Sequence, residues 1–183
     1  MKRDAQIAGL FDLFAEDLLA ERSPRPLIII GASKVDHLLG EILVAFLLPK
    51  ISKKKDPDEM LEGDAPLGTF SARTKMCRRL GIIDETLYRA IDRLRVLRNL
   101  SAHSVSFDHS QSPAREHLAE LRKQVAHRAS YRLTHGRFFD GATLQPIEEM
   151  QCLLLTVCVL LEAIHEKVEQ TSGNKNALVI ASR

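Results

Sequence analysis

The sequence predicts an all-α fold, a single-domain bundle of about six or seven helices. Apolar residues recur every three or four positions through most of the chain, which is the period of a helix with one buried face. No segment of useful length alternates apolar and polar residues, as a half-buried strand would. The chain has 183 residues, 45% of them hydrophobic, which is enough for one domain with a sizeable core.

Four helices are predicted in the first half of the chain. The first covers residues 4–22 and ends at the Ser23–Pro26 segment, because proline disfavours helical backbone before it. The second runs from about residue 26 to 48 and is apolar on most sides, so it is expected at the centre. The third runs from about residue 70 to 80, with Thr69 or Ser71 as its cap and Gly81 as its end. Asp84 caps the fourth, which starts at Glu85.

Two further helices are predicted in the second half, at about 113–127 and 146–170. The last contains an almost wholly apolar run, 150–161, so it is expected to be buried or to form a dimer interface. Residues 128–145 are ambiguous and are interpreted as a long connection packed by Tyr131, Phe138 and Phe139. We therefore expect one helical domain at 1–171 and a flexible tail at 172–183.

Composition narrows the classes of function. Lys and Arg number 26 against 24 Asp and Glu, so only a local basic patch could bind nucleic acid or anionic lipid. The lysine-rich stretch 50–55 is expected to be a solvated loop, because acidic residues follow it at once. Aromatic residues make up 5% of the chain, without tryptophan, which disfavours stacking on single-stranded nucleic acid. The most apolar stretch, 27–48, carries several charged residues, so no membrane span is expected.

Metal or cofactor chemistry is not expected from the sequence. The three cysteines lie inside helical patterns without CxxC spacing, which favours reduced, buried thiols in a cytoplasmic protein. Glu162 and His165 match half of a carboxylate-bridged di-iron motif, but the second copy that such a site needs is missing. Both are therefore expected to be solvated.

The polar residues Arg98, Asn99 and His103 form a compact constellation at the end of the fourth helix. At about 100° per residue, Arg98 falls inside the apolar stripe of that helix. A guanidinium that faces a core needs a partner, so Arg98 is expected either to pair with a carboxylate or to line a cleft. Asp36, in the second helix, is either a residue on the polar edge or a carboxylate that meets a cation.

Two interpretations of Arg98–His103 follow. In the structural one, Arg98 pairs with a buried carboxylate, while Asn99 and His103 cap the helix end. In the catalytic one, His103 acts as a general base and Arg98 stabilises phosphate charge in metal-independent RNA cleavage. Positions five apart on a helix differ in direction by about 140°, so the catalytic arrangement requires a helix end near Ala102 or a two-fold dimer.

A third possibility is a helix-turn-helix at 70–93. The turn at 80–89 superficially resembles that of resolvase-type DNA-binding domains, and the preceding helix carries Arg73, Lys75, Arg78 and Arg79. A recognition helix must expose its N-terminal half to the major groove, whereas this helix continues as a strong apolar stripe to Leu100. Two bundle helices joined by a capped turn explain the same pattern.

Four ordered blocks between residues 27 and 125 resemble the mannitol operon repressor (MltR) family. The most specific block holds Glu62, Gly63, Pro66, Gly68, Phe70 and Arg73. The other three contain Asp36 in the second helix, Gly81 in the turn, and Arg98, Asn99 and His103 at the end of the fourth helix. The chain departs from the family pattern at Met76–Arg79 and at Leu100–Ser101.

This resemblance implies an all-helical cytoplasmic regulator that represses sugar-alcohol uptake genes. Because the family lacks an evident DNA-binding motif, repression is expected to act through a protein partner. The resemblance also implies a homo-oligomer, with a dimer favoured. In that interpretation the motif residues 66–73 and 98–103 pack together as a structural or ligand-facing core. The Arg98–His103 element is also similar to that of HEPN domains, some of which are metal-independent ribonucleases that act as dimers.

Overall fold

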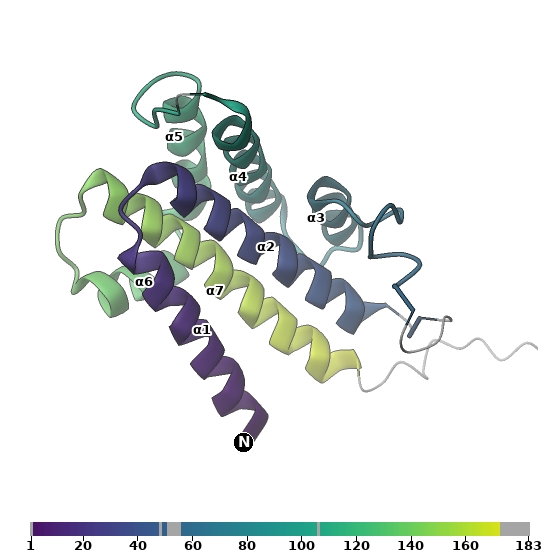
Figure 1. The fold of residues 1–183 in the computed structure, drawn as a ribbon. Helices are drawn as coiled ribbons and strands as arrows, with labels where there is room; N and C mark the ends of the chain where they lie inside the picture. The colour runs from purple at the N-terminus through teal and green to yellow at the C-terminus, as the bar shows by residue number, and fades with distance from the viewer. Residues whose placement is uncertain (1, 48, 51–55, 106, 173–183) are drawn as a thin grey trace, which may run out of the picture.

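The computed structural model describes residues 2–47, 49–50, 56–105 and 107–172, and within these ranges it contains seven α-helices and no strand (Figure 1). The helices are α1 (Lys2–Ala20), α2 (Pro24–Phe46), α3 (Phe70–Arg79), α4 (Glu85–His103), α5 (Ala114–Val125), α6 (Ala129–Phe139) and α7 (Pro146–Ser172). The all-α prediction is confirmed. Residues 51–55 of the lysine-rich stretch and 173–183 of the predicted tail lie outside the described ranges, and Ser172 still belongs to α7.

Helices α2 and α7 form the centre of the bundle and lie alongside each other (Figure 1). Gly31 on α2 allows α7 to approach closely, because a Cβ atom at position 31 would lie only 2.9 Å from the Leu154 side chain of α7. Core residues of α2, such as Leu27, Leu39 and Ile42, have no exposed surface. The predicted burial of the second and last helices is therefore confirmed. Helix α4 packs on α2 and on α5, while α3 packs on α2 and α4.

Local signals set the helix ends. Ser23 occupies the N-cap position of α2, so Pro24 and Pro26 lie in the first turn instead of preceding the helix, where proline's missing N–H is tolerated. Thr69 Oγ1 accepts a hydrogen bond from Ala72 N–H at 3.2 Å, which confirms it as the cap of α3. Gly81 has a φ of +71°. Its N–H and that of Ile82 donate to the carbonyls of Arg78 and Cys77, which is a Schellman ending.

The segment 128–145 contains a helix that the sequence pattern did not predict. Helix α6 covers most of it and packs on α7. Tyr131 and Phe138 are partly buried against the core, as expected. The helical period was obscured because Thr134 is the one buried residue of α6 and Leu133 is 73% exposed, so its apolar residues do not form one buried stripe.

Gln151 is a buried polar residue inside the apolar run of α7, with 1% of its surface exposed. Its amide nitrogen donates to the carbonyl oxygens of Leu18, Leu19 and Glu21 at 3.0–3.2 Å. These carbonyls end α1 and have no partner within that helix. A side chain 130 or more positions away in sequence therefore caps α1 and attaches it to the centre of the bundle.

The three cysteines are buried and free. Burial raises the pKa of Cys77 and of Cys158 to about 12, and that of Cys152 to about 11. The thiols are therefore protonated at neutral pH and poorly nucleophilic. None of the described helices contains an apolar stretch long enough to span a bilayer.

Candidate functional site

Arg73 connects the motif residues of α2, α3 and the loop before α3. Its Nη1 pairs with Asp36 Oδ1 on α2 at 2.9 Å. Its Nε and Nη2 donate to the carbonyl oxygens of Leu67 and Leu61 at 3.0 and 2.8 Å. The side chains of Arg73 and Asp36 expose only 17% and 31% of their surface. Asp36 therefore meets a cation, as one interpretation expected, and that cation is Arg73.

The loop held by Arg73 depends on its glycines. Gly63 has a φ of +60°, where side chains other than glycine are strained. A Cβ atom on Gly68 would lie 2.2 Å from the Gly63 carbonyl oxygen, so position 68 accommodates no side chain in this backbone. The loop is closed by hydrogen bonds from Leu67 N–H to the Met60 carbonyl and from Gly68 N–H to the Ala65 carbonyl, both 2.8 Å.

The remaining motif residues of this block divide between core and surface. Phe70 opens α3 and packs against the core, whereas Glu62 and Pro66 are exposed on the loop. Together with the bonds of Arg73, this arrangement gives Asp36, Gly63, Gly68, Phe70 and Arg73 a structural role. The block builds a loop on α2, and Glu62 and Pro66 are exposed side chains on it.

The structure corrects the expected burial of Arg98. Arg98 is exposed, and its Nη1 donates to Asn99 Oδ1 at 3.2 Å. Its Cα–Cβ direction lies within the apolar stripe of α4, but Leu97 and Ser101 are buried there and Arg98 is not. Angular position gives the direction of a side chain and not the presence of a neighbour, and at this end of α4 none of the described helices covers Arg98.

His103 is the last residue of α4 and is also exposed. Since α4 continues unbroken from Arg98 to His103, the two side chains diverge by about 140°. The carbonyl oxygens just beyond His103 are instead held by Arg25, whose Nη2 lies 2.7 Å from Ser104 O and 3.1 Å from Val105 O. Arg25 was not identified from the sequence, because this partnership joins the start of α2 to the end of α4.

The two motif regions lie at different positions along α2 and do not form one site. Arg73 meets α2 at Asp36, while the end of α4 meets it at Arg25. These positions are eleven residues apart, which corresponds to about 16 Å along a helix axis. The expectation that 66–73 and 98–103 pack against each other is therefore wrong.

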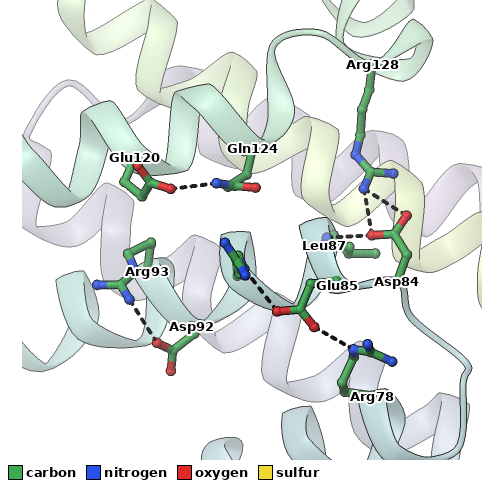
Figure 2. Close-up of polar contacts among 10 residues, drawn as sticks. Arg78, Asp84, Glu85, Leu87, Asp92, Arg93, Glu120, Gln124 and Arg128 are labelled. Atoms are coloured by element: carbon green, nitrogen blue, oxygen red, sulfur yellow. Dashed lines mark hydrogen bonds and ion pairs between the residues drawn. The ribbon is translucent and has the colours of Figure 1, made fainter.

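Ion pairs surround the turn between α3 and α4 (Figure 2). Asp84 Oδ1 caps α4 by accepting from Leu87 N–H at 2.6 Å, and both Asp84 oxygens accept from Arg128 Nη2 at 2.7 and 2.9 Å. Partial burial acts to raise the pKa of Asp84, but these hydrogen bonds outweigh it and the pKa lies below its usual value. Asp84 thus confirms the predicted cap and joins it to the start of α6.

Glu85 engages Arg78, one of the arginines considered for DNA contact, and also Arg89, which lies in the segment 70–93. It pairs with Arg89 at 3.0 Å and with Arg78 at 2.9 Å, and hydrogen bonds from these two arginines lower its pKa. Both carboxylates, Asp84 and Glu85, lie at the N-terminal end of α4, which a recognition helix would insert into the major groove between the two phosphate backbones. This charge arrangement disfavours α4 as a DNA-reading helix.

Glu162 and His165 have separate partners and do not lie in one shared site. Glu162 lies 3.0 Å from Lys34 Nζ, and His165 Nε2 lies 3.9 Å from Glu169. Among the residues with described placement, no group of three or more His, Cys, Asp or Glu side chains has the arrangement of a metal site. Glu162 is thus a partner of Lys34 on α2, which adds an ionic contact to the packing of α2 on α7.

Comparison with known proteins adds information at the level of the fold. No family model matches the sequence, and no curated protein matches it. The structure is similar to that of a possible transcriptional regulator, YggD, from Shigella flexneri, with a TM-score of 0.60 and 15% identity, covering 84% of this chain and 98% of that one. It is also similar to a chain in the structure of the MtlR–HPr complex from Escherichia coli, with a TM-score of 0.55 and 18% identity, covering 88% and 99%. The chain thus has the fold of these proteins along nearly their whole length.

Proposed function

We propose that this chain is a cytoplasmic transcriptional regulator of the MltR type, which represses carbohydrate uptake genes, in particular those for sugar alcohols, through a protein partner. The observation that carries the proposal is the similarity of fold to two chains, one described as a possible transcriptional regulator and the other solved in a complex that contains HPr. The matched sequence blocks support it. The pairing of Arg78 and Arg89 with Glu85 favours a partner protein over direct operator contact.

The proposal is tested with the gene and with the purified chain. Deleting the gene is expected to raise transcripts of sugar-alcohol uptake genes, and restoring it in trans is expected to lower them. Isothermal titration calorimetry with HPr from the same organism is expected to give saturable binding. Gel shifts with the promoter DNA of those genes are expected to show no salt-resistant complex. Unchanged transcripts in the deletion strain would contradict the proposal. A gel shift that Arg89→Ala reduces would show that the chain binds the operator DNA directly and not through a partner protein.

A metal-independent ribonuclease is the second candidate function. The observation in its favour is that Arg98 and His103 are both exposed. Arg98 donates to Asn99 and not to a buried carboxylate, as the structural interpretation would require. Because the two side chains diverge on α4, cleavage requires a dimer in which His103 of one subunit approaches Arg98 of the other. The homo-oligomer expected from the resemblance would supply that arrangement.

RNA cleavage by the purified chain in EDTA distinguishes this candidate from the regulator. The candidate predicts cleavage that is lost in His103→Ala and Arg98→Ala and retained in His37→Ala, which alters an exposed histidine on α2. Analytical ultracentrifugation of the same samples measures the dimer. Absence of cleavage by a dimeric wild-type protein, or cleavage that His103→Ala leaves intact, rejects the ribonuclease.

A further inference from the structure

A groove of about 740 Å³ separates α5 from the N-terminal part of α7. Its floor is apolar and is formed by Leu118 of α5 with Met150 and Leu153 of α7. Met150 and Leu153 belong to the hydrophobic core, and Leu118 packs against that core. The floor is thus a place where the core of the bundle reaches the surface between two helices.

The rim of this groove is cationic. Arg115, Arg122 and Lys123 project from α5 and are exposed, and His109 and His127 lie beside it. Glu149 is the one carboxylate among the lining residues and pairs with Arg122 at 2.8 Å. Lys123 reaches a carboxylate outside the lining, Glu120, only at 4.0 Å. Three permanent positive charges therefore face one negative charge around an apolar floor.

The walls of the groove have helical spacing. The lining residues Arg115, Leu118 and Arg122 of α5, with Ala126 at its C-cap, follow one face over eleven positions, which is about 16 Å or three turns. On α7 the lining residues are Pro146, Glu149, Met150 and Leu153, which again share one face. The α7 wall spans seven positions, or about 10 Å. Two facing walls of about two and three turns can receive a third helix, whose apolar residues recur at i, i+3, i+4 and i+7.

We propose that this groove docks an acidic amphipathic helix of the protein partner; this inference rests on the proposed function and adds the partner's chemistry to it. Apolar residues of the incoming helix meet Leu118, Met150 and Leu153, and carboxylates on its flanks meet Arg115 and Lys123. A sugar alcohol fits poorly, because it needs several fixed hydrogen-bonding groups and the floor is apolar. Helix α1 of a second copy is acidic, but its Phe11, Ala15 and Leu18 are already buried in its own subunit.

Fluorescence anisotropy with a stapled helical peptide tests the docking site on the full chain. The probe is a labelled peptide of about 16 residues with leucines at i, i+3, i+4 and i+7 and glutamates on both flanks. Its control has the same leucines and lysine flanks. We expect saturable binding of the acidic peptide that weakens as salt is added, and no binding of the basic one. Equal binding of both peptides, or no binding of either, overturns the proposal.

Variants locate the binding on the chain. The double change Arg115→Glu and Lys123→Glu is expected to weaken binding of the acidic peptide about tenfold or more. Lys75→Glu with Arg79→Glu is the matched control, because both residues are exposed on α3, and it is expected to leave affinity unchanged. Leu118→Asp should abolish binding, with Leu133→Asp on α6 as its control. Thermal denaturation of each variant identifies any that fails to fold.

The two proposals fail separately. If the acidic peptide does not bind while HPr binding and transcript repression are observed, the groove assignment alone is overturned. If the peptide binds through Arg115 and Lys123 while gene deletion leaves transcripts unchanged, the regulatory function is overturned and the groove remains a docking site. Dodecanoate, an anionic amphiphile, is titrated in parallel. Its binding without peptide binding identifies a small-molecule site and refutes the helix-docking proposal.

Discussion

The strongest stability prediction concerns Arg73→Ala, which removes the contact between α2, α3 and the loop before α3. Three hydrogen bonds disappear, to Asp36 and to the carbonyls of Leu61 and Leu67. At about 1 kcal/mol net for each, the free energy of unfolding should fall by about 3 kcal/mol. The ionic part contributes little of this, because Asp36 is 31% exposed and water screens the pair. For a chain of this size the loss corresponds to a Tm lower by about 6–12 °C.

Two conservative variants separate the contributions of Arg73. Arg73→Lys keeps the charge opposite Asp36 but cannot reach both carbonyls, since an ammonium lacks the planar fork of a guanidinium. It should lose about 1–2 kcal/mol. Asp36→Asn keeps the acceptor oxygen and should lose about 0.5–1 kcal/mol.

Urea denaturation followed by circular dichroism gives the three free energies, and hydrogen exchange at the Leu67 and Gly68 amides reports on the loop itself. The expected order of destabilisation is Arg73→Ala, then Arg73→Lys, then Asp36→Asn. The structural role of Arg73 is refuted if the free energy of unfolding of Arg73→Ala lies within about 0.5 kcal/mol of wild type, which is the range of ordinary surface changes. It is also refuted if Asp36→Asn is the most destabilising of the three variants.

Four other predictions follow from the described contacts. Gly68→Ala should cost about 2 kcal/mol or more in a urea titration, because its Cβ would meet the Gly63 carbonyl oxygen. Asp84→Ala should cost about 1 kcal/mol as a lost helix cap. Since the folded-state pKa of Asp84 lies below 3.8, wild type should lose this stabilisation as pH falls from about 4 through that lowered value. The free energy of unfolding of Asp84→Ala should therefore depend less on pH in this acidic range than that of wild type. Gln151→Leu should cost about 1–3 kcal/mol and speed hydrogen exchange in α1, because three carbonyls lose their donor. The three thiols should react with Ellman's reagent at pH 8 only after unfolding, because they are buried and their pKa values are raised; fast labelling of the folded chain would contradict this burial.

Local signals made most of the helices predictable. Thr69, Gly81 and Asp84 lie where their cap geometry requires them, because capping depends on residues within one turn. Helix α6 was missed because periodicity identifies a helix when one of its faces is apolar and buried, and Thr134 is the one buried residue of α6.

Long-range partnerships could not be predicted in the same way. Arg73 and Asp36 are 37 positions apart and Gln151 and Glu21 are 130 apart, and no pattern in a single sequence pairs them. Arg98 illustrates the opposite error. Its angular position on α4 was worked out correctly, but burial depends on whether another helix covers that side, and this is a property of the whole bundle.

The location of the motif residues explains why similarity of fold decides so little about activity here. Gly63, Gly68 and Arg73 belong to the most specific block of the resemblance, and Asp36 belongs to the block in the second helix. Each of the four has a contact or backbone conformation that builds the loop on α2. Such structural roles concern the architecture and do not identify what the protein binds. We therefore expect function to depend on exposed groups, such as the end of α4 and the proposed docking groove beside α5. Substitutions at Arg98, His103, Arg115 and Lys123 are therefore the informative ones, because they can change activity while leaving the bundle intact.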